Sequence, residues 1–152
     1  MKRILLIVLL TTGFYMASNA QNMGGSYKTS IGAKGYFGDG SIGGFNIKHF
    51  IQDNRALEGS LLFRNKVFLL EGLYEWHGDI NGADGLKWYA GPGAWIGSSF
   101  NNFVLAGRGT VGLDYKFSGA PINVAFDVNP TLTFTPDTDF SFFAGIAFRF
   151  AL

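Results

Sequence analysis

The chain has 152 residues and contains no cysteine, which excludes a disulfide framework and thiolate chemistry. Its formal net charge of +1 argues against the strongly basic surface that a nucleic-acid-binding protein needs. This length is sufficient for one domain. Glycine, with 22 residues, and phenylalanine, with 16, are both more frequent than in ordinary globular proteins.

The first 20 residues predict a secretory signal peptide. Residues 1–3 form a short positive region, residues 4–10 form an uninterrupted apolar run, and small residues stand at Ser18 and Ala20. The apolar run is too short to span a membrane as a helix. We therefore expect cleavage after Ala20, which leaves residues 21–152 as one mature domain. Without Lys2 and Arg3, this domain has 10 basic and 11 acidic residues, a net charge of −1.

After the signal peptide, polar and apolar residues alternate in eight segments, which is the period of a strand with one wet and one apolar face. The clearest segment, Ile122 to Phe134, places an apolar residue at every even position. The expected strands comprise residues 27–37, 42–51, 56–64, 67–77, 86–97, 103–117, 122–134 and 141–150. Short turn signals join them, so the pattern predicts an all-β fold, an eight-stranded antiparallel up-and-down β-barrel.

Two details qualify this barrel. Pro92 and Pro130 fall within expected strands and would each remove a ladder donor, so we expect bulges or strand ends there. The longest connection is residues 78–85, and we expect the outward loops to have about four to five residues. Loops of that length are too short to indicate an adhesin.

The alternation alone does not decide which face of the barrel points outward. A soluble lipocalin-like barrel places apolar residues inside, whereas a membrane barrel places them outside. Two features favour a transmembrane barrel: aromatic residues gather near strand ends, as in membrane-interface girdles, and the chain ends in an alternating strand, Phe148 to Leu152. Such a strand is typical of the carboxy-terminal sorting signal of outer-membrane proteins. The expected aromatic girdle comprises Phe37, Tyr74, Trp76, Trp88, Tyr115, Phe117, Phe134, Phe148 and Phe150.

Several blocks carry a family resemblance: RALEGSLLF, GLYEWHGDI, LKWYAGPGAWIG, GLDYKF and PINVAFDVNPTLTF. They resemble the small outer-membrane β-barrel proteins of Bacteroidetes, which are similar in plan to the OmpA transmembrane domain and OmpX. The resemblance covers about Ile31 to Phe150. It implies the outer membrane of a Gram-negative bacterium, with membrane lipid and the barrel-insertion machinery as partners. It implies no catalytic residue and names no protein partner.

The polar face is expected to fill the interior with charges. The expected luminal charge network comprises Lys34, Glu71, Glu75, Lys87, Arg108, Asp114, Lys116, Asp127 and Arg149. Because charges in a narrow lumen are tolerated only when they are paired, we expect Arg108 to be the hub of this network. Its planar guanidinium suits two carboxylates at once, and Glu71 or Asp127 is the expected partner.

No catalytic, cofactor-binding or metal-binding residue is expected, and the chain is not expected to be an enzyme. His77 with Glu75 and Glu71 could form a metal or acid/base cluster, but ligands two residues apart are weak support, and a polar lumen is the preferred interpretation. Three functions remain: a structural or interaction barrel with a plugged polar lumen, a narrow channel, and a soluble periplasmic or secreted lipocalin-like carrier of an apolar ligand. The channel is disfavoured because an eight-stranded interior is only wide enough for its own side chains.

Overall fold

The computed structural model describes residues 27–152, and the predicted signal peptide with its cleavage site lies outside these residues. The strands are β1 (Thr29–Gly38), β2 (Gly40–Gln52), β3 (Arg55–Arg64), β4 (Val67–Asp79), β5 (Leu86–Ser99), β6 (Asn102–Lys116), β7 (Ile122–Thr135) and β8 (Asp139–Ala151). Each strand pairs antiparallel with its chain neighbours, and β8 pairs with β1 to close the barrel. The predicted eight-stranded antiparallel up-and-down barrel is confirmed. No helix in residues 27–152 is long and apolar enough to cross a membrane.

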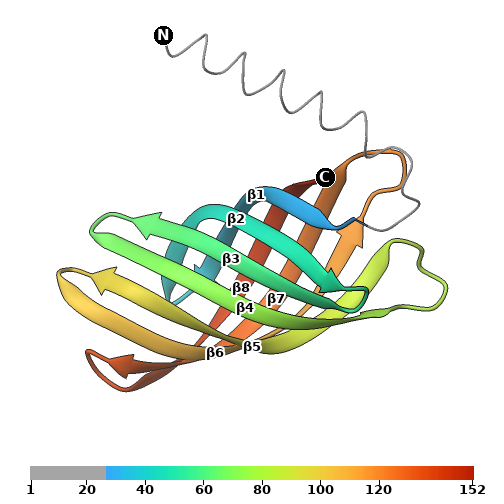
Figure 1. Ribbon diagram of the computed structural model, residues 1–152. Coiled ribbons are helices and arrows are strands. Elements are labelled where there is room, and N and C mark those ends of the chain that lie inside the picture. The colour runs from blue at the N-terminus through green and yellow to red at the C-terminus, as the bar shows by residue number, and fades with distance from the viewer. Residues whose placement is uncertain (1–26) are drawn as a thin grey trace, which may run out of the picture.

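The barrel has two ends that differ in their connections (Figure 1). At the terminal end, where β1 begins and β8 ends, the connections are residues 53–54, 80–85 and 117–121. At the opposite, distal end they are Asp39, Asn65–Lys66, Phe100–Asn101 and residues 136–138. These distal turns have one to three residues, so the expectation of four to five residues was wrong. Positive φ angles at Lys66, Phe100 and Asn101 let the two-residue turns reverse the chain.

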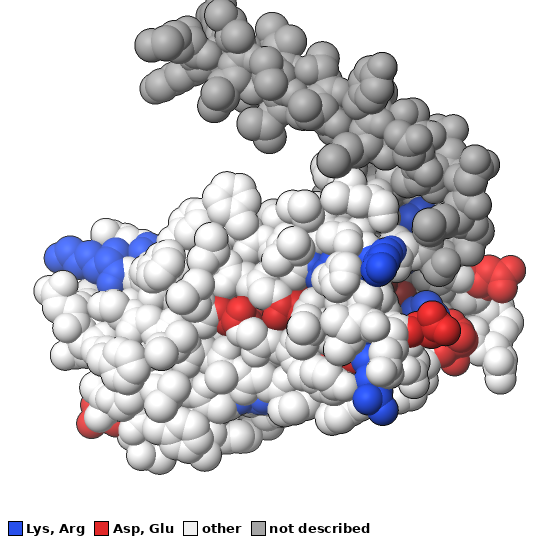
Figure 2. Space-filling view, viewed as in Figure 1, with Lys and Arg blue, Asp and Glu red and all other residues white. Residues whose placement is uncertain are grey.

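Strand alternation separates a polar interior from an apolar outer wall. Phe45 and Val111, on the wall, are 67% and 63% exposed, whereas the inward Lys34 and Arg149 are 2% and 0% exposed. Figure 2 accordingly shows a mostly uncharged middle zone, with Lys, Arg, Asp and Glu gathered mainly toward the two ends. This polarity is the inverse of a soluble barrel that carries an apolar ligand.

The sequence predicted a bulge or a strand end at each of two prolines, and this prediction was wrong. Pro92 and Pro130 stand inside β5 and β7, and neither lies at a bulge or a strand end. Pro92 stays paired with Gly109 of β6, and the ladder is interrupted only on the β4 side, without a change of register. Since proline lacks one N–H, it loses pairing to one neighbouring strand and keeps the other. The register shifts occur elsewhere, between Phe50 and Gln52 in β2 and between Leu105 and Ala106 in β6.

Candidate functional site

The interior is organised around Glu58 of β3, a residue that the predicted network did not include. Its carboxylate lies 2.5 Å from the Lys34 ammonium, 2.7 Å from Arg149 Nη2 and 3.1 Å from Lys48 Nζ. The Asn46 amide donates a further hydrogen bond of 3.1 Å to Glu58 Oε1. All of these side chains are buried, so three cations converge on one enclosed carboxylate. Glu58 is therefore the hub that the sequence analysis assigned to Arg108.

The register of the β2–β3 hairpin brings Lys48 and Glu58 together. An unbroken ladder from the turn at residues 53–54 would pair Lys48 with Gly59, which faces the wall, not the lumen. The register shift between Phe50 and Gln52 moves the pairing by one residue, so Lys48 stands opposite Glu58 on the same inward face. The sequence alternation already placed both Lys48 and Glu58 on the inward face. Two inward residues can be paired only if the register shifts by one residue, so the alternation contained a signal for this pair.

Arg149 and Lys48 extend the network toward the terminal end through Asp114 and Glu75. Lys48 Nζ lies 2.8 Å from Glu75 and 3.2 Å from Asp114, and Arg149 Nη1 lies 3.6 Å from Asp114. The hydroxyl of Tyr27 donates to Asp114 at 3.0 Å, and Asn123 Nδ2 donates to the same carboxylate at 2.6 Å. Burial raises the pKa of the Tyr27 phenol, which keeps it protonated as a donor.

Asp127 of β7 connects Lys34 to the aromatic interior. Lys34 Nζ lies 2.9 Å from its carboxylate, the Tyr89 hydroxyl donates to it at 2.6 Å, and Asn129 donates a further hydrogen bond. Two inward glycines, Gly112 and Gly145, stand opposite Asp127 on the neighbouring strands. A Cβ at Gly145 would lie 2.1 Å from the Asp127 carboxylate, and one at Gly112 would lie 2.7 Å from the Tyr89 ring. Glycine is therefore required here to admit the carboxylate and the tyrosine.

Arg108 belongs to a second cluster nearer the distal end, and it is not a hub. Its Nη1 lies 2.6 Å from Glu71, and no other carboxylate lies within ion-pair distance among the described residues. Glu71 also accepts hydrogen bonds from the Tyr36 hydroxyl, Ser60 and Trp95 Nε1. The guanidinium carbon lies 3.8 Å from the Trp95 ring centroid and 4.4 Å from that of Tyr36. Of the two predicted partners, the structure brings Glu71 to Arg108 and gives Asp127 to Lys34.

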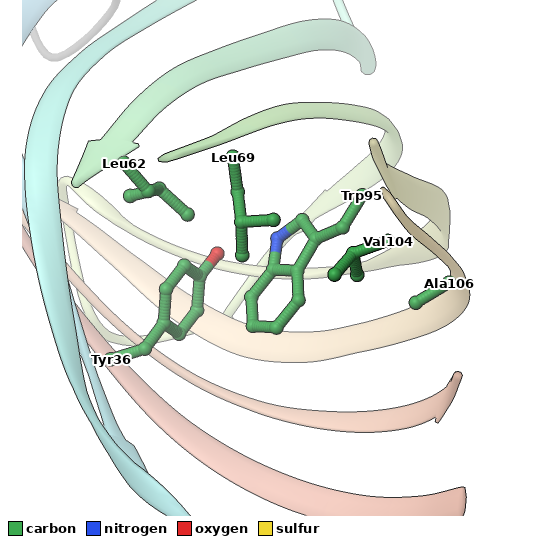
Figure 3. Close-up of a cluster of buried hydrophobic side chains, with 6 residues drawn as sticks. All are labelled: Tyr36, Leu62, Leu69, Trp95, Val104 and Ala106. Atoms are coloured by element: carbon green, nitrogen blue, oxygen red, sulfur yellow. The ribbon is translucent and has the colours of Figure 1, made fainter. Parts of the chain in front are cut away.

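The same cluster fills the lumen on its distal side. Tyr36, Leu62, Leu69, Trp95, Val104 and Ala106 form one buried apolar group. Figure 3 shows the rings of Tyr36 and Trp95 directed into the interior, with Leu62 and Leu69 beside them. The Tyr36 and Trp95 rings meet edge to face at 5.6 Å, and Phe143 packs on Trp95 at 5.2 Å.

Two predicted members of the network lie outside it. Lys87 pairs with Asp79 at 2.5 Å near the terminal rim, where the Asp79 side chain is 81% exposed. Lys116 donates to the carbonyl oxygens of Phe117 and Ala120 and so fastens the β6–β7 connection. Lys87 is the second residue of β5 and Lys116 is the last residue of β6, so both lie at the terminal end, where the inward face opens to the rim. The prediction that they join the interior network was wrong.

The three residues of the possible acid/base cluster are divided between the Glu58 network and the Arg108 cluster. His77 Nε2 lies 2.8 Å from Glu75, whose same oxygen also binds Lys48, whereas Glu71 pairs with Arg108 in the distal cluster. His77 stacks on Tyr89 with ring centroids 5.2 Å apart. In residues 27–152, no group of three His, Cys, Asp or Glu side chains is arranged to hold a metal ion.

A cavity of about 620 Å³ opens at the terminal end of the lumen. Its lining includes Tyr27, Phe50, His77, Lys87, Asp114 and Lys116. The sequence did not predict this cavity, because its walls come from four strands whose relative heights depend on the barrel stagger. The lumen is thus open at the terminal end and packed with side chains toward the distal end.

The predicted girdle residues lie on the outer wall, although Tyr74 and Tyr115 are half-buried. Adjacent pairs contact each other: the rings of Tyr74 and Trp76 are 5.2 Å apart, and those of Tyr115 and Phe117 are 4.7 Å apart. Phe37 and Phe134 lie near the distal turns, whereas the other predicted girdle residues lie in the half nearer the terminal end. Exposed phenylalanines that the prediction did not include surround the distal end: Phe45, Phe63, Phe68, Phe100, Phe103, Phe140 and Phe142.

Comparison with known proteins supports the fold. No family model and no curated protein matched the sequence. Among solved structures, the N-terminal β-barrel domain of Pseudomonas aeruginosa OprF is similar, with a TM-score of 0.61 and 17% sequence identity. The match covers 84% of this chain and 100% of the OprF domain chain. At this identity, the likeness establishes the shared barrel fold.

Proposed function

We propose that this chain is an outer-membrane β-barrel protein with a structural or interaction role and a plugged polar lumen. The observation that carries the proposal is the outer wall: its large apolar side chains are exposed, while lysine, arginine and carboxylate side chains are enclosed. Exposed wall residues on this scale would be unfavourable in water, whereas a charge in the middle of a bilayer costs about 2–4 kcal/mol.

The strand lengths also fit a bilayer. A tilted transmembrane strand needs about 9–11 residues, and the strands here have 10 to 15. At the terminal end, Arg55 is paired with Trp76 on β4. A cation beside an indole is typical of a membrane interface, where the charge reaches water and the ring stays in the headgroup layer.

We further propose that the lumen does not conduct ions. Support comes from the Arg108 cluster nearer the distal end, in which the Arg108 guanidinium packs against the rings of both Tyr36 and Trp95. The role proposed is not enzymatic, because the interior carboxylates and cations bind one another. Membrane lipid and the barrel-insertion machinery are the proposed partners, in the outer membrane of a Gram-negative bacterium. The affiliation with Bacteroidetes barrels rests on the sequence blocks described above.

Fractionation with and without detergent tests this proposal. After expression in a Gram-negative host, we expect the mature protein to sediment with membranes and to enter solution only with detergent. An unboiled sample should migrate differently from a boiled one, because the closed barrel resists unfolding by detergent. Recovery as a soluble periplasmic monomer would contradict the proposal.

A further inference from the structure

The β5–β6 turn at the distal end has a chemistry unlike the other three distal turns. The connections β1–β2, β3–β4 and β7–β8 carry Asp39, Lys66 and Asp137, respectively, whereas Ser99, Phe100, Asn101 and Asn102 are all uncharged. Phe100, at the first position of the turn, is 63% exposed. In Figure 1 this hairpin is drawn in yellow to orange at the distal end.

The backbone at Phe100 is strained. Its φ of 48° lies in the left-handed region, where a bulky side chain is an outlier and Asn or Gly is the usual residue of such a turn. The Phe100 N–H donates to the Lys66 carbonyl at 2.9 Å, which fixes the turn against its neighbour. Such backbone strain usually persists only where another interaction compensates for it. The ring of Phe100 is exposed, so the described residues do not enclose it.

The ring continues the apolar wall. Phe100 directly follows Ser99, the last residue of β5, and its side chain is exposed next to the outward-facing residues Ile96 and Ser98. Ser98 is paired with Phe68 on one side and with Phe103 on the other. The phenylalanines at these two positions are 48% and 55% exposed, so exposed aromatic side chains of the wall border the turn on both sides.

We propose that the β5–β6 turn is inserted in the membrane, with Phe100 in contact with lipid acyl chains, while the charged β3–β4 turn beside it lies in water. This inference rests on the proposed function, because it requires the wall to face lipid. Acyl chains are the occupant because exposed phenylalanines of that wall border the turn and the turn itself contains no charge. Contact with the membrane compensates the strain at Phe100 and holds the barrel in one orientation.

Site-directed spin labelling in lipid bilayers tests the proposal, and the chain has no native cysteine to interfere. The variants are Phe100→Cys, Lys66→Cys as the matched left-handed position (φ 57°), and Val111→Cys as the reference on the wall. Phe103→Cys provides a second label on the same hairpin at an ordinary strand position. Each label is exposed to oxygen, which concentrates in lipid, and to a water-soluble nickel chelate.

We expect the labels at 100, 103 and 111 to be more accessible to oxygen and the label at 66 to be more accessible to nickel. Nickel-dominated accessibility at 100 and 103, with oxygen-dominated accessibility at 111, would overturn the insertion of the turn and leave the membrane barrel intact. Low accessibility to both reagents at 100 would indicate a protein contact and would also overturn it. Nickel-dominated accessibility at 111 would contradict the proposed function itself.

Discussion

Replacing Arg149 with methionine should destabilise the barrel more than replacing Glu58 with glutamine. The buried ion pairs of the Glu58 network and the Arg108 cluster together involve four cations, Lys34, Lys48, Arg108 and Arg149, and five carboxylates, Glu58, Glu71, Glu75, Asp114 and Asp127. Glu58→Gln leaves four of each sign. Arg149→Met leaves three cations facing five carboxylates and removes the donor to Asn46 and Asn123.

The magnitudes follow from that imbalance. Removing one partner of a buried pair costs about 3–5 kcal/mol. We expect Glu58→Gln to cost an amount near the lower bound, because Lys34 keeps Asp127 as a partner and Lys48 keeps Glu75 and Asp114. We expect Arg149→Met to cost an amount near the upper bound. The double variant restores an excess of one carboxylate, so its cost should fall short of the sum by about 2 kcal/mol.

The assay is equilibrium unfolding by urea in lipid bilayers, followed by tryptophan fluorescence. A control cycle combines Glu58→Gln with Arg108→Met, two residues that share no ion pair, and should be additive within about 0.5 kcal/mol. Additivity of Arg149→Met and Glu58→Gln would refute Glu58 as the hub of the network.

Three further predictions concern the distal cluster, the lumen and the amino terminus. In double-mutant cycles, Arg108→Met should couple with Glu71→Gln by about 1–3 kcal/mol and should be additive with Asp127→Asn, because Glu71 is the one carboxylate in residues 27–152 that pairs with Arg108. Purified protein in planar bilayers should show no reproducible single-channel steps, because Tyr36, Trp95 and Arg108 fill the interior; regular steps would contradict the plugged lumen. Mass spectrometry of the mature protein should find Gln21 at its amino terminus, and a chain that retains residues 4–10 would contradict the predicted cleavage.

The fold could be predicted because period-two alternation is a local property. In β7, from Ile122 to Thr135, each residue's side of the sheet follows from its position in the sequence, without knowledge of any partner. Strand boundaries came within about two residues for the same reason. The distal turns were shorter than expected because the strands continue through Ser41, Ser98, Ser99 and Asn102, which were interpreted as turn residues.

The candidate site was harder to predict because ion pairs in a lumen depend on register and on distances across the barrel. Arg108 and Asp127 are on adjacent strands, but Arg108 is opposite Thr131 and Asp127 is opposite Gly112. The connection at residues 117–121 sets that register, because the register shift between Leu105 and Ala106 lies beyond both residues on the distal side. No sequence signal fixes the length of this connection. Arg149 reaches Glu58 across the lumen from β8 to β3, a contact that depends on the stagger of the closed barrel.

The most direct test of the account is lipid quenching of the three tryptophans. Trp76 and Trp88 lie on the wall and are 43% and 46% exposed, whereas Trp95 is enclosed in the lumen and 5% exposed. The measurement compares a variant that keeps only Trp88 with one that keeps only Trp95, each in bilayers of lipid brominated on the acyl chains near the headgroups. We predict strong quenching of Trp88 and little quenching of Trp95. Equal quenching of both, or none of Trp88 in protein that is folded in the bilayer, would contradict an apolar wall in lipid around a sealed polar interior.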